Sequence, residues 1–207
     1  MRFDSTKHHR RSIRLRGYDY TQAAAYFVTI CAQNRECLFG EIVDGTMRLS
    51  DAGRMVQDEW FRTSVVRSHV ELDVFVVMPN HIHGIVCIAD DGRGTARRAP
   101  TVERFGHPVH GSLPTIIRAF KSATTKRINE IRHAPGIPVW QRNYYEHVIR
   151  NESEWDRIRE YIVGNPASWE QDINNPAYGS DGKTRPLEEE FRGIFTEPGY
   201  GRNRTAM

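Results

Sequence analysis

The chain has 207 residues, of which 39% are hydrophobic, and a formal net charge of +3. This length is typical of one domain with appendages, and the apolar fraction is sufficient for a hydrophobic core. No stretch approaches the roughly 18 consecutive apolar residues of a membrane-spanning helix, so we expect no contact with a membrane.

The cysteines and the N-terminus indicate a reducing compartment. Cys31, Cys37 and Cys87 form no paired C-x-x-C pattern, which argues against a disulfide framework and a structural zinc site. The arginine-rich N-terminus is not followed by an apolar segment. We therefore predict no secretory signal and a cytoplasmic protein.

Basic residues are concentrated in two segments, 1–20 and 92–133, whereas the part after residue 151 is richer in acids. For either segment alone, a solvated charged surface is the simpler explanation. Two such segments together indicate a polyanionic partner. The candidate phosphate-contacting side chains are Arg11, Arg14, Arg16, Arg118, Lys121 and Arg142.

The first half of the chain alternates strand patterns with one helix pattern. Asp44-Gly45 is a strong hairpin turn signal between two short strands, and Ser50 is a suitable N-cap for the helix that follows. The predicted elements are a strand over 26–31, hairpin strands over 37–43 and 46–49, a helix from 50 to about 63, and strands over 70–77 and 81–88.

The second half is predicted to contain two helices around one strand. Ser112 and Pro114 begin a helix with apolar residues at helical spacing to residue 131, and a strand follows within 139–149. Asn151 and Glu154 resemble a capping box for a helix over 152–164. We expect Asn165-Pro166 to interrupt that helix, because a residue before proline avoids the helical region. Asn165 could then cap a short following turn with Pro166 in first position.

Without the hairpin and the last helix, the order is βαββαβ. This order is that of the ferredoxin-like α+β fold, an antiparallel sheet with both helices on one face, which leaves the other face for a site. The hairpin and a C-terminal helix that carries Tyr161 are additions. We predict a basic arm over 1–19, a catalytic domain over 20–170 and a tail over 171–207, with no usable pattern over 89–112.

His81 and His83 lie on one predicted strand, which follows a strand and a tight turn. Side chains alternate along a strand, so both imidazoles point to one face and Ile82 to the other. Two imidazoles on one face can bind a divalent ion or position a phosphate. Taken alone, this short pattern also fits two ordinary hydrogen-bonded histidines.

Tyr161 lies at the edge of the apolar stripe of the last helix. A tyrosine there is often packing, but a phenol beside a metal-bound phosphate can act as a nucleophile if its pKa of about 10 is offset by a nearby cation or base. Asn165 falls on nearly the same face if the helical path continues. Its oxygen could complete a site for Mg²⁺ or Mn²⁺, and two histidines favour Mn²⁺.

Five stretches in this order resemble the HUH single-tyrosine transposases, most closely the REP-associated tyrosine transposases, a bacterial group related to single-strand insertion-sequence transposases. Jointly the stretches are specific, although His-x-His alone is not. They span residues 14–20, 25–31, 78–84, 139–151 and 161–166.

The resemblance implies that Tyr161 attacks a phosphodiester of single-stranded DNA, giving a 5′-phosphotyrosine and a free 3′-hydroxyl. Attack by a DNA 3′-hydroxyl then reverses the reaction and transfers the strand. His81 and His83 would hold the metal with Asn165 as third ligand. The substrates would be hairpins of repetitive extragenic palindromes, acted on by a cytoplasmic, nucleoid-associated monomer or homodimer.

Other interpretations remain open from the sequence. Tyr144 and Tyr145 are competing tyrosines that we assign to the core or to base stacking, and Trp140 is a further candidate DNA contact beside Arg142. The chain could instead be a hairpin-binding protein that does not cut, or a histidine–metal hydrolase of small phosphoesters. Whether Tyr161 reaches the histidines of its own chain is also open.

Overall fold

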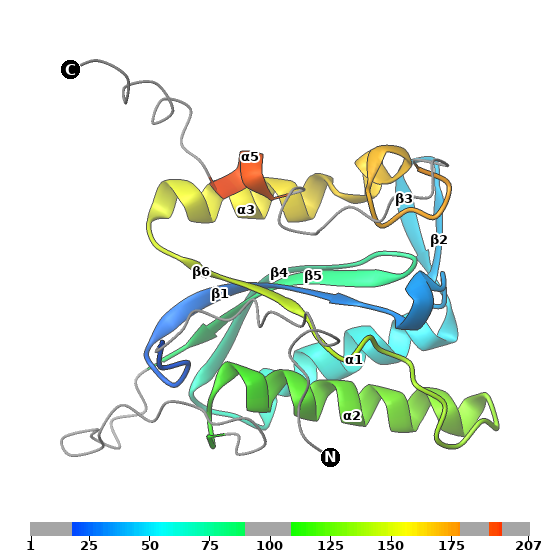
Figure 1. The fold of residues 1–207 in the computed structure, drawn as a ribbon, viewed down its shortest axis with the longest axis horizontal. Helices are drawn as coiled ribbons and strands as arrows, with labels where there is room; N and C mark the ends of the chain where they lie inside the picture. The colour runs from blue at the N-terminus through cyan, green and yellow to red at the C-terminus, as the bar shows by residue number, and fades with distance from the viewer. Residues whose placement is uncertain (1–17, 90–108, 179–190, 196–207) are drawn as a thin grey trace, which may run out of the picture.

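A computed structural model describes residues 18–89, 109–178 and 191–195 (Figure 1). Three of the predicted DNA contacts, Arg11, Arg14 and Arg16, lie outside these ranges. In the described ranges, we find no helix with the length and hydropathy needed to cross a bilayer.

The main sheet has four strands in the order β4-β5-β1-β6, and every neighbouring pair is antiparallel. This is the strand order of the ferredoxin-like fold, so the predicted fold class is confirmed. A separate hairpin is formed by β2 and β3. The strands are β1 Ala24–Cys31, β2 Gly40–Val43, β3 Thr46–Leu49, β4 Val70–Val77, β5 His81–Ile88 and β6 Tyr145–Ile149.

Helices cover both faces of the sheet. Figure 1 shows α1 and α2 on one face and α3 on the other. The second face, which we expected to be uncovered, is therefore closed over by the tyrosine-bearing helix and the residues after it. The helical elements are η1 Gln33–Arg35, α1 Asp51–Val65, α2 Leu113–Ile131, α3 Glu152–Gly164, η2 Pro166–Gln171 and α5 Arg192–Phe195.

The predicted local signals are present in the structure. Asp44 and Gly45 both have positive φ, as a tight hairpin turn requires. The Ser50 hydroxyl accepts a hydrogen bond from the Gly53 amide at 3.1 Å, and the Asn151 side chain accepts one from the Glu154 amide at 2.8 Å. Both N-caps satisfy an amide that has no partner within its own helix.

The prediction that α3 ends at Asn165-Pro166 is confirmed, because α3 ends at Gly164 and Pro166 is the first residue of η2. The conformation of Asn165 differs from the one expected before a proline. Asn165 has helical angles, φ −60° and ψ −42°, and Pro166 begins η2 directly. Proline is tolerated in a first helical turn because its missing amide has no intrahelical partner there. Asn165 therefore stays on a helical path after Tyr161.

Alternation along β1 and β5 divides the interior into two cores. Residues such as Val28 and Ile82 pack against α1 and α2, whereas Phe27 and Ile85 pack against α3 and Phe191. Because both faces are covered, almost every residue of the two central strands is buried. His81 and His83 thus face the α3 side.

Gly84 directly follows His83 in β5 and faces the α1 side of the sheet. A Cβ atom there would lie 2.4 Å from the Trp60 ring, which is buried and stacked on Phe75. We expect Gly84→Ala to lower the free energy of unfolding by about 1–3 kcal/mol, as overpacking does. Urea denaturation measures this loss.

Gly164→Ala is the matched control, because a Cβ at Gly164 would have no neighbour within 4 Å. It should leave the free energy of unfolding unchanged or slightly raised, since alanine favours helices. Equal midpoints for the two variants would show that Trp60 is not held in place.

Candidate active site

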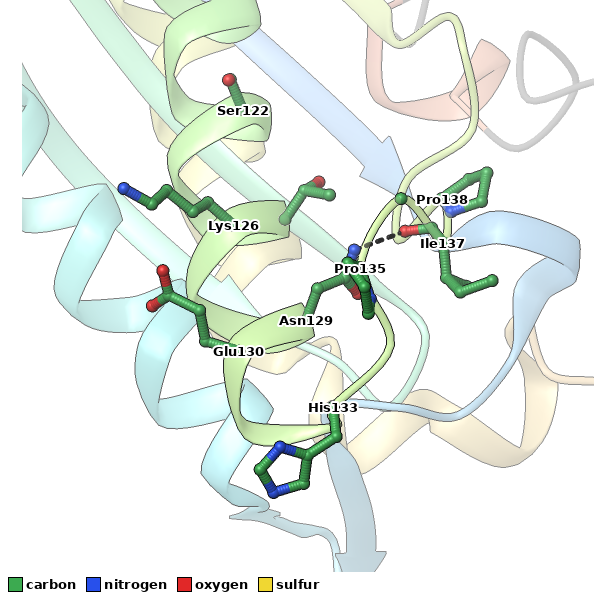
Figure 2. A pocket seen from close by; sticks show the side chains of 10 residues that line it. Ser122, Lys126, Asn129, Glu130, His133, Pro135, Ile137 and Pro138 are labelled. Atoms are coloured by element: carbon green, nitrogen blue, oxygen red, sulfur yellow. Dashed lines mark hydrogen bonds between the residues drawn. The ribbon is translucent and has the colours of Figure 1, made fainter.

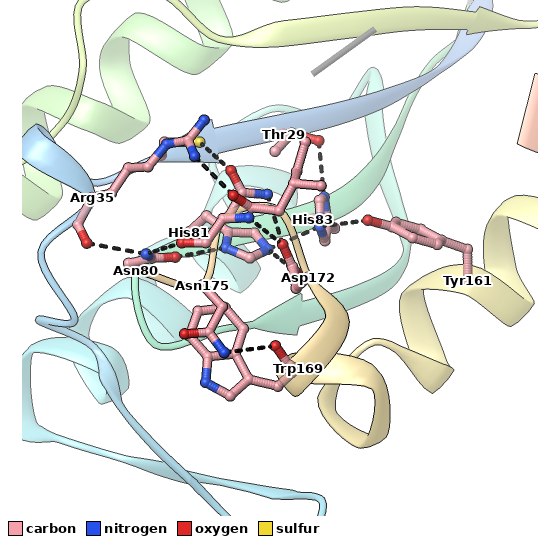
Figure 3. A network of polar contacts seen from close by, with 12 residues as sticks. Thr29, Arg35, Asn80, His81, His83, Tyr161, Trp169, Asp172 and Asn175 are labelled. Atoms are coloured by element: carbon pink, nitrogen blue, oxygen red, sulfur yellow. Dashed lines mark hydrogen bonds and ion pairs between the residues drawn. The ribbon is translucent and has the colours of Figure 1, made fainter. Parts of the chain in front are cut away.

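His81 and His83 are completely buried between the sheet and the α3 side of the molecule. Their Nε2 atoms face each other at 2.9 Å (Figure 3). This arrangement follows from the strand, because residues two apart on β5 project from the same face. The two imidazoles therefore converge on one point, as predicted.

Asn80 orients the His81 ring. The Asn80 amide nitrogen donates to the carbonyls of Arg35, at 3.0 Å, and Asn174, at 2.7 Å, so its oxygen faces His81 Nδ1 at 2.9 Å. An amide oxygen only accepts, so Nδ1 carries the proton and His81 Nε2 keeps a free lone pair. This is how outer hydrogen bonds prepare a histidine to bind a metal.

The His83 ring is held by Thr29 on the neighbouring strand. Thr29 Oγ1 lies 2.8 Å from His83 Nδ1, because Thr29 and His83 are paired across β1 and β5. A hydroxyl can accept the Nδ1 proton and so leave Nε2 free. Phe27 stacks on the same ring at 5.6 Å.

Burial keeps both imidazoles neutral. Burial is the main cause that lowers the pKa of His81 to about 4. Asp172 opposes this effect, and Arg35 adds a smaller one in the same direction as burial. Burial also lowers the pKa of His83 well below its usual value, and His81 adds to this. Neutral imidazoles at neutral pH are the form that binds metals.

Tyr161 reaches the histidine pair from α3. Its hydroxyl lies 3.2 Å from His83 Nε2, as Figure 3 shows. The ring is held edge-on by Phe27 and Phe191, with centroids at 6.2 and 5.7 Å. Within a single chain, the phenol and the imidazoles therefore meet.

Two further side chains, one on each side of η2, carry unsatisfied oxygens. Asn165 Oδ1 and Asp172 Oδ2 are buried and have no hydrogen-bond partner among the described residues. Asp172 Oδ2 lies 3.6 Å from His81 Nε2. Ligand atoms of His81, His83 and Asp172 all lie within 4.8 Å of one another.

The sequence analysis missed Asp172, which falls within the segment predicted as a tail. No spacing rule relates Asp172 to the histidines, because η2 and the turn after it set its position. The only local signal is the run of Asp172, Asn174 and Asn175, a composition typical of side-chain-bonded turns. The assignment of 171–207 to a separate tail remains a prediction, but this part of it contacts the site.

The donor set fits a divalent ion. Two neutral imidazole nitrogens and a carboxylate oxygen suit Mn²⁺ better than Mg²⁺, which prefers oxygen ligands. The unsatisfied Oδ2 atom of Asp172 is the observation in favour, since buried polar atoms normally have partners.

The other candidate DNA contacts lie away from this site. Trp140 is buried in the core, where its Nε1 donates to Thr124 at 2.7 Å, so its ring is not accessible to a base. Lys121 donates to the carbonyls of Gln141 and Asn143, both at 2.9 Å, and so anchors the chain before β6.

Arg118 and Arg142 are exposed, and their contact with DNA remains a prediction. A hollow at the C-terminal end of α2 is lined by Lys126, Asn129 and His133 among others (Figure 2). It lies on the α2 side of the sheet, whereas the histidines face α3.

The competing tyrosines have packing roles. Tyr145 is buried, with its ring 4.7 Å from that of Phe191 and 6.3 Å from that of Phe27. Tyr144 packs at the edge of the other core, and Lys121 lies 5.5 Å above its ring. These positions agree with the prediction of core packing for the pair.

No family model matches the chain. Among solved structures, a REP-associated tyrosine transposase bound to a REP hairpin matches with a TM-score of 0.50 and 19% identity, over 84% of this chain and 94% of that one. The sheet order and the helix over its histidine face thus define an α+β protein with the fold of that transposase. The resemblance predicted from the sequence is confirmed at the level of the fold.

A comparison of sequences finds one relative that is similar over most of both chains. An uncharacterized protein of Haemophilus influenzae (strain Rd) is 41% identical over 174 residues, covering 83% of this chain and 96% of that protein. The chain belongs to the same family as this protein.

Proposed function

We propose that the protein is a metal-dependent endonuclease and strand transferase that acts on hairpins in single-stranded DNA through a 5′-phosphotyrosine at Tyr161. The observation that carries the proposal is the position of the Tyr161 hydroxyl, 3.2 Å from the Nε2 atom of a buried, neutral histidine pair. The fold shared with a transposase bound to a REP hairpin supports the same substrate class.

The residues divide the reaction between them. The Tyr161 oxygen forms a new bond to phosphorus while the bond to the 3′ oxygen breaks. In net terms the proton of the Tyr161 hydroxyl passes to that oxygen, which leaves as a 3′-hydroxyl. His81 and His83 would hold the divalent ion, with Asn165 as a candidate third ligand. When bound, such an ion polarises the phosphate and stabilises the departing oxygen.

The reaction is reversible by its chemistry. One phosphodiester is exchanged for another, so the energy of the broken bond is kept in the phosphotyrosine. A DNA 3′-hydroxyl can attack that linkage and restore Tyr161, which joins two strands. Strand transfer therefore needs no added energy source.

The test is incubation of the full chain with 5′- and 3′-labelled single-stranded hairpins and Mn²⁺, followed by a denaturing gel. A protein band that carries only the label 3′ of the cut is expected, together with a shortened strand bearing a 3′-hydroxyl. The band should be absent with EDTA. Cleavage of hairpins without a covalent band would contradict the tyrosine mechanism.

A hairpin-binding protein that does not cut is the second candidate. It is favoured by the complete burial of both imidazoles, against which Phe191 packs with its ring 6.0 Å from that of His83. A phosphate can reach the pair only when a covering side chain moves. Hairpin binding with neither cleavage nor adduct would establish this alternative.

A further inference from the structure

Asp172 is positioned by contacts that fix both of its carboxylate oxygens. Oδ1 accepts hydrogen bonds from the Asn174 amide at 2.6 Å and from the Asn174 side chain at 3.0 Å. Oδ2 has no hydrogen-bond partner and points toward the histidine pair, 3.6 Å from His81 Nε2. The turn therefore uses one oxygen and leaves the other available.

The segment that carries Asp172 is fastened to the end of the sheet beside the site. Arg35 donates to the Ile173 carbonyl at 2.9 Å, and Asn80 donates to the Asn174 carbonyl at 2.7 Å. Asn80 also contacts the His81 ring, so one amide group positions the histidine and the segment opposite it. The approach of Asp172 to the histidines is built into the fold (Figure 3).

Among the described residues, no lysine or arginine lies within ion-pair distance of the Asp172 carboxylate. The Asp172 side chain is 2% exposed, and in the described part of the chain the only basic side chain within ion-pair distance is His81. Buried charges in proteins are normally paired or bound to metals.

We propose that Asp172 Oδ2 is a direct, anionic ligand of the divalent ion held by His81 and His83, and that the turn after η2 exists to deliver it. This inference rests on the metal site of the proposed function and adds a charged ligand to it. Asn165 and Asp172 flank η2 on either side. A carboxylate among the ligands lets the protein retain Mn²⁺ without DNA.

The test is a Mn²⁺ titration of the full chain without DNA, followed by calorimetry and by the loss of the free-ion paramagnetic resonance signal. Asp172→Asn should weaken Mn²⁺ affinity by more than about 10-fold, the lower end of losses caused by outer partners alone. The asparagine oxygen can still accept the two Asn174 bonds, so the turn is retained.

Glu170→Gln is the matched control, because it removes the same charge from an exposed residue of η2. Its affinity should stay close to that of the wild type. The Mn²⁺-induced rise in melting temperature, present in the wild type and in Glu170→Gln, should be lost in Asp172→Asn. Equal affinity of Asp172→Asn and wild type would overturn the proposal.

A wild-type measurement covers the case in which Asp172→Asn does not fold. Anomalous diffraction from crystals soaked in Mn²⁺ should place the ion in direct contact with Asp172 Oδ2, and an ion bound without this contact would refute the assignment. These measurements need no DNA. If the wild type forms no adduct but Asp172→Asn loses Mn²⁺ affinity, the assignment of Asp172 as a ligand stands and the proposed nuclease is refuted. If the wild type forms the adduct but Asp172→Asn binds Mn²⁺ normally, the nuclease stands and the assignment of Asp172 is refuted.

Discussion

Tyr161→Phe is expected to abolish covalent attachment to hairpin DNA while leaving hairpin binding nearly unchanged. The substitution removes only the hydroxyl, which lies 3.2 Å from His83 Nε2. The ring keeps its edge contacts with Phe27 and Phe191, so the helix stays in place. Without a nucleophilic oxygen, no phosphotyrosine can form.

Denaturing gels measure the adduct and gel shifts measure hairpin binding, both with Mn²⁺ present. Tyr145→Phe is the matched control, because Tyr145 packs against the same rings, Phe27 and Phe191, from β6. This control should form the adduct at the wild-type level. If Tyr161→Phe still forms the adduct, or if only Tyr145→Phe loses it, Tyr161 is not the nucleophile.

The strands and helix starts were predictable because their causes are local. The Asp44-Gly45 turn and the caps at Ser50 and Asn151 depend on residues within one turn of the chain, and the structure contains all three. Alternation along β5 likewise placed His81 and His83 on one face. Short-range chemistry sufficed for these features.

Other features of the structure depend on packing between distant segments. Asn165 takes helical angles before a proline because η2 continues the path, and Trp140 is in the core because it packs between Phe39 and Phe120. Neither contact has a sequence pattern. The closing of the second sheet face by α3 is of the same kind.

Asp172 shows why the site itself was only partly predictable. His81 and His83 are linked by a strand period, and Tyr161 and Asn165 by a helix period. Asp172 has no period in common with either pair, and its direction is set by hydrogen bonds to Asn174. Regular elements reveal ligand pairs in a sequence, whereas a ligand on a turn appears only in three dimensions.

His83→Gln is expected to remove both Mn²⁺ binding and adduct formation. His83 Nε2 contacts both His81 and the Tyr161 hydroxyl, so it joins the metal ligands to the nucleophile. Loss of several kcal/mol of stabilisation by the ion corresponds to a fall in cleavage rate of about 1,000-fold or more. Single-turnover cleavage of labelled hairpins and Mn²⁺ titration measure the two effects.

The variant must also be shown to fold, because His83 is buried and Thr29 Oγ1 bonds to its Nδ1 atom at 2.8 Å. Leaving that hydroxyl without a partner costs about 1–3 kcal/mol, which lowers the melting temperature without unfolding a stable domain. His147→Gln is the control, because His147 lies on β6 and its Nε2 atom pairs with Glu154 of α3 at 2.8 Å. The His147→Gln variant should keep both Mn²⁺ binding and adduct formation. A comparable loss in both variants would contradict a specific role of His83.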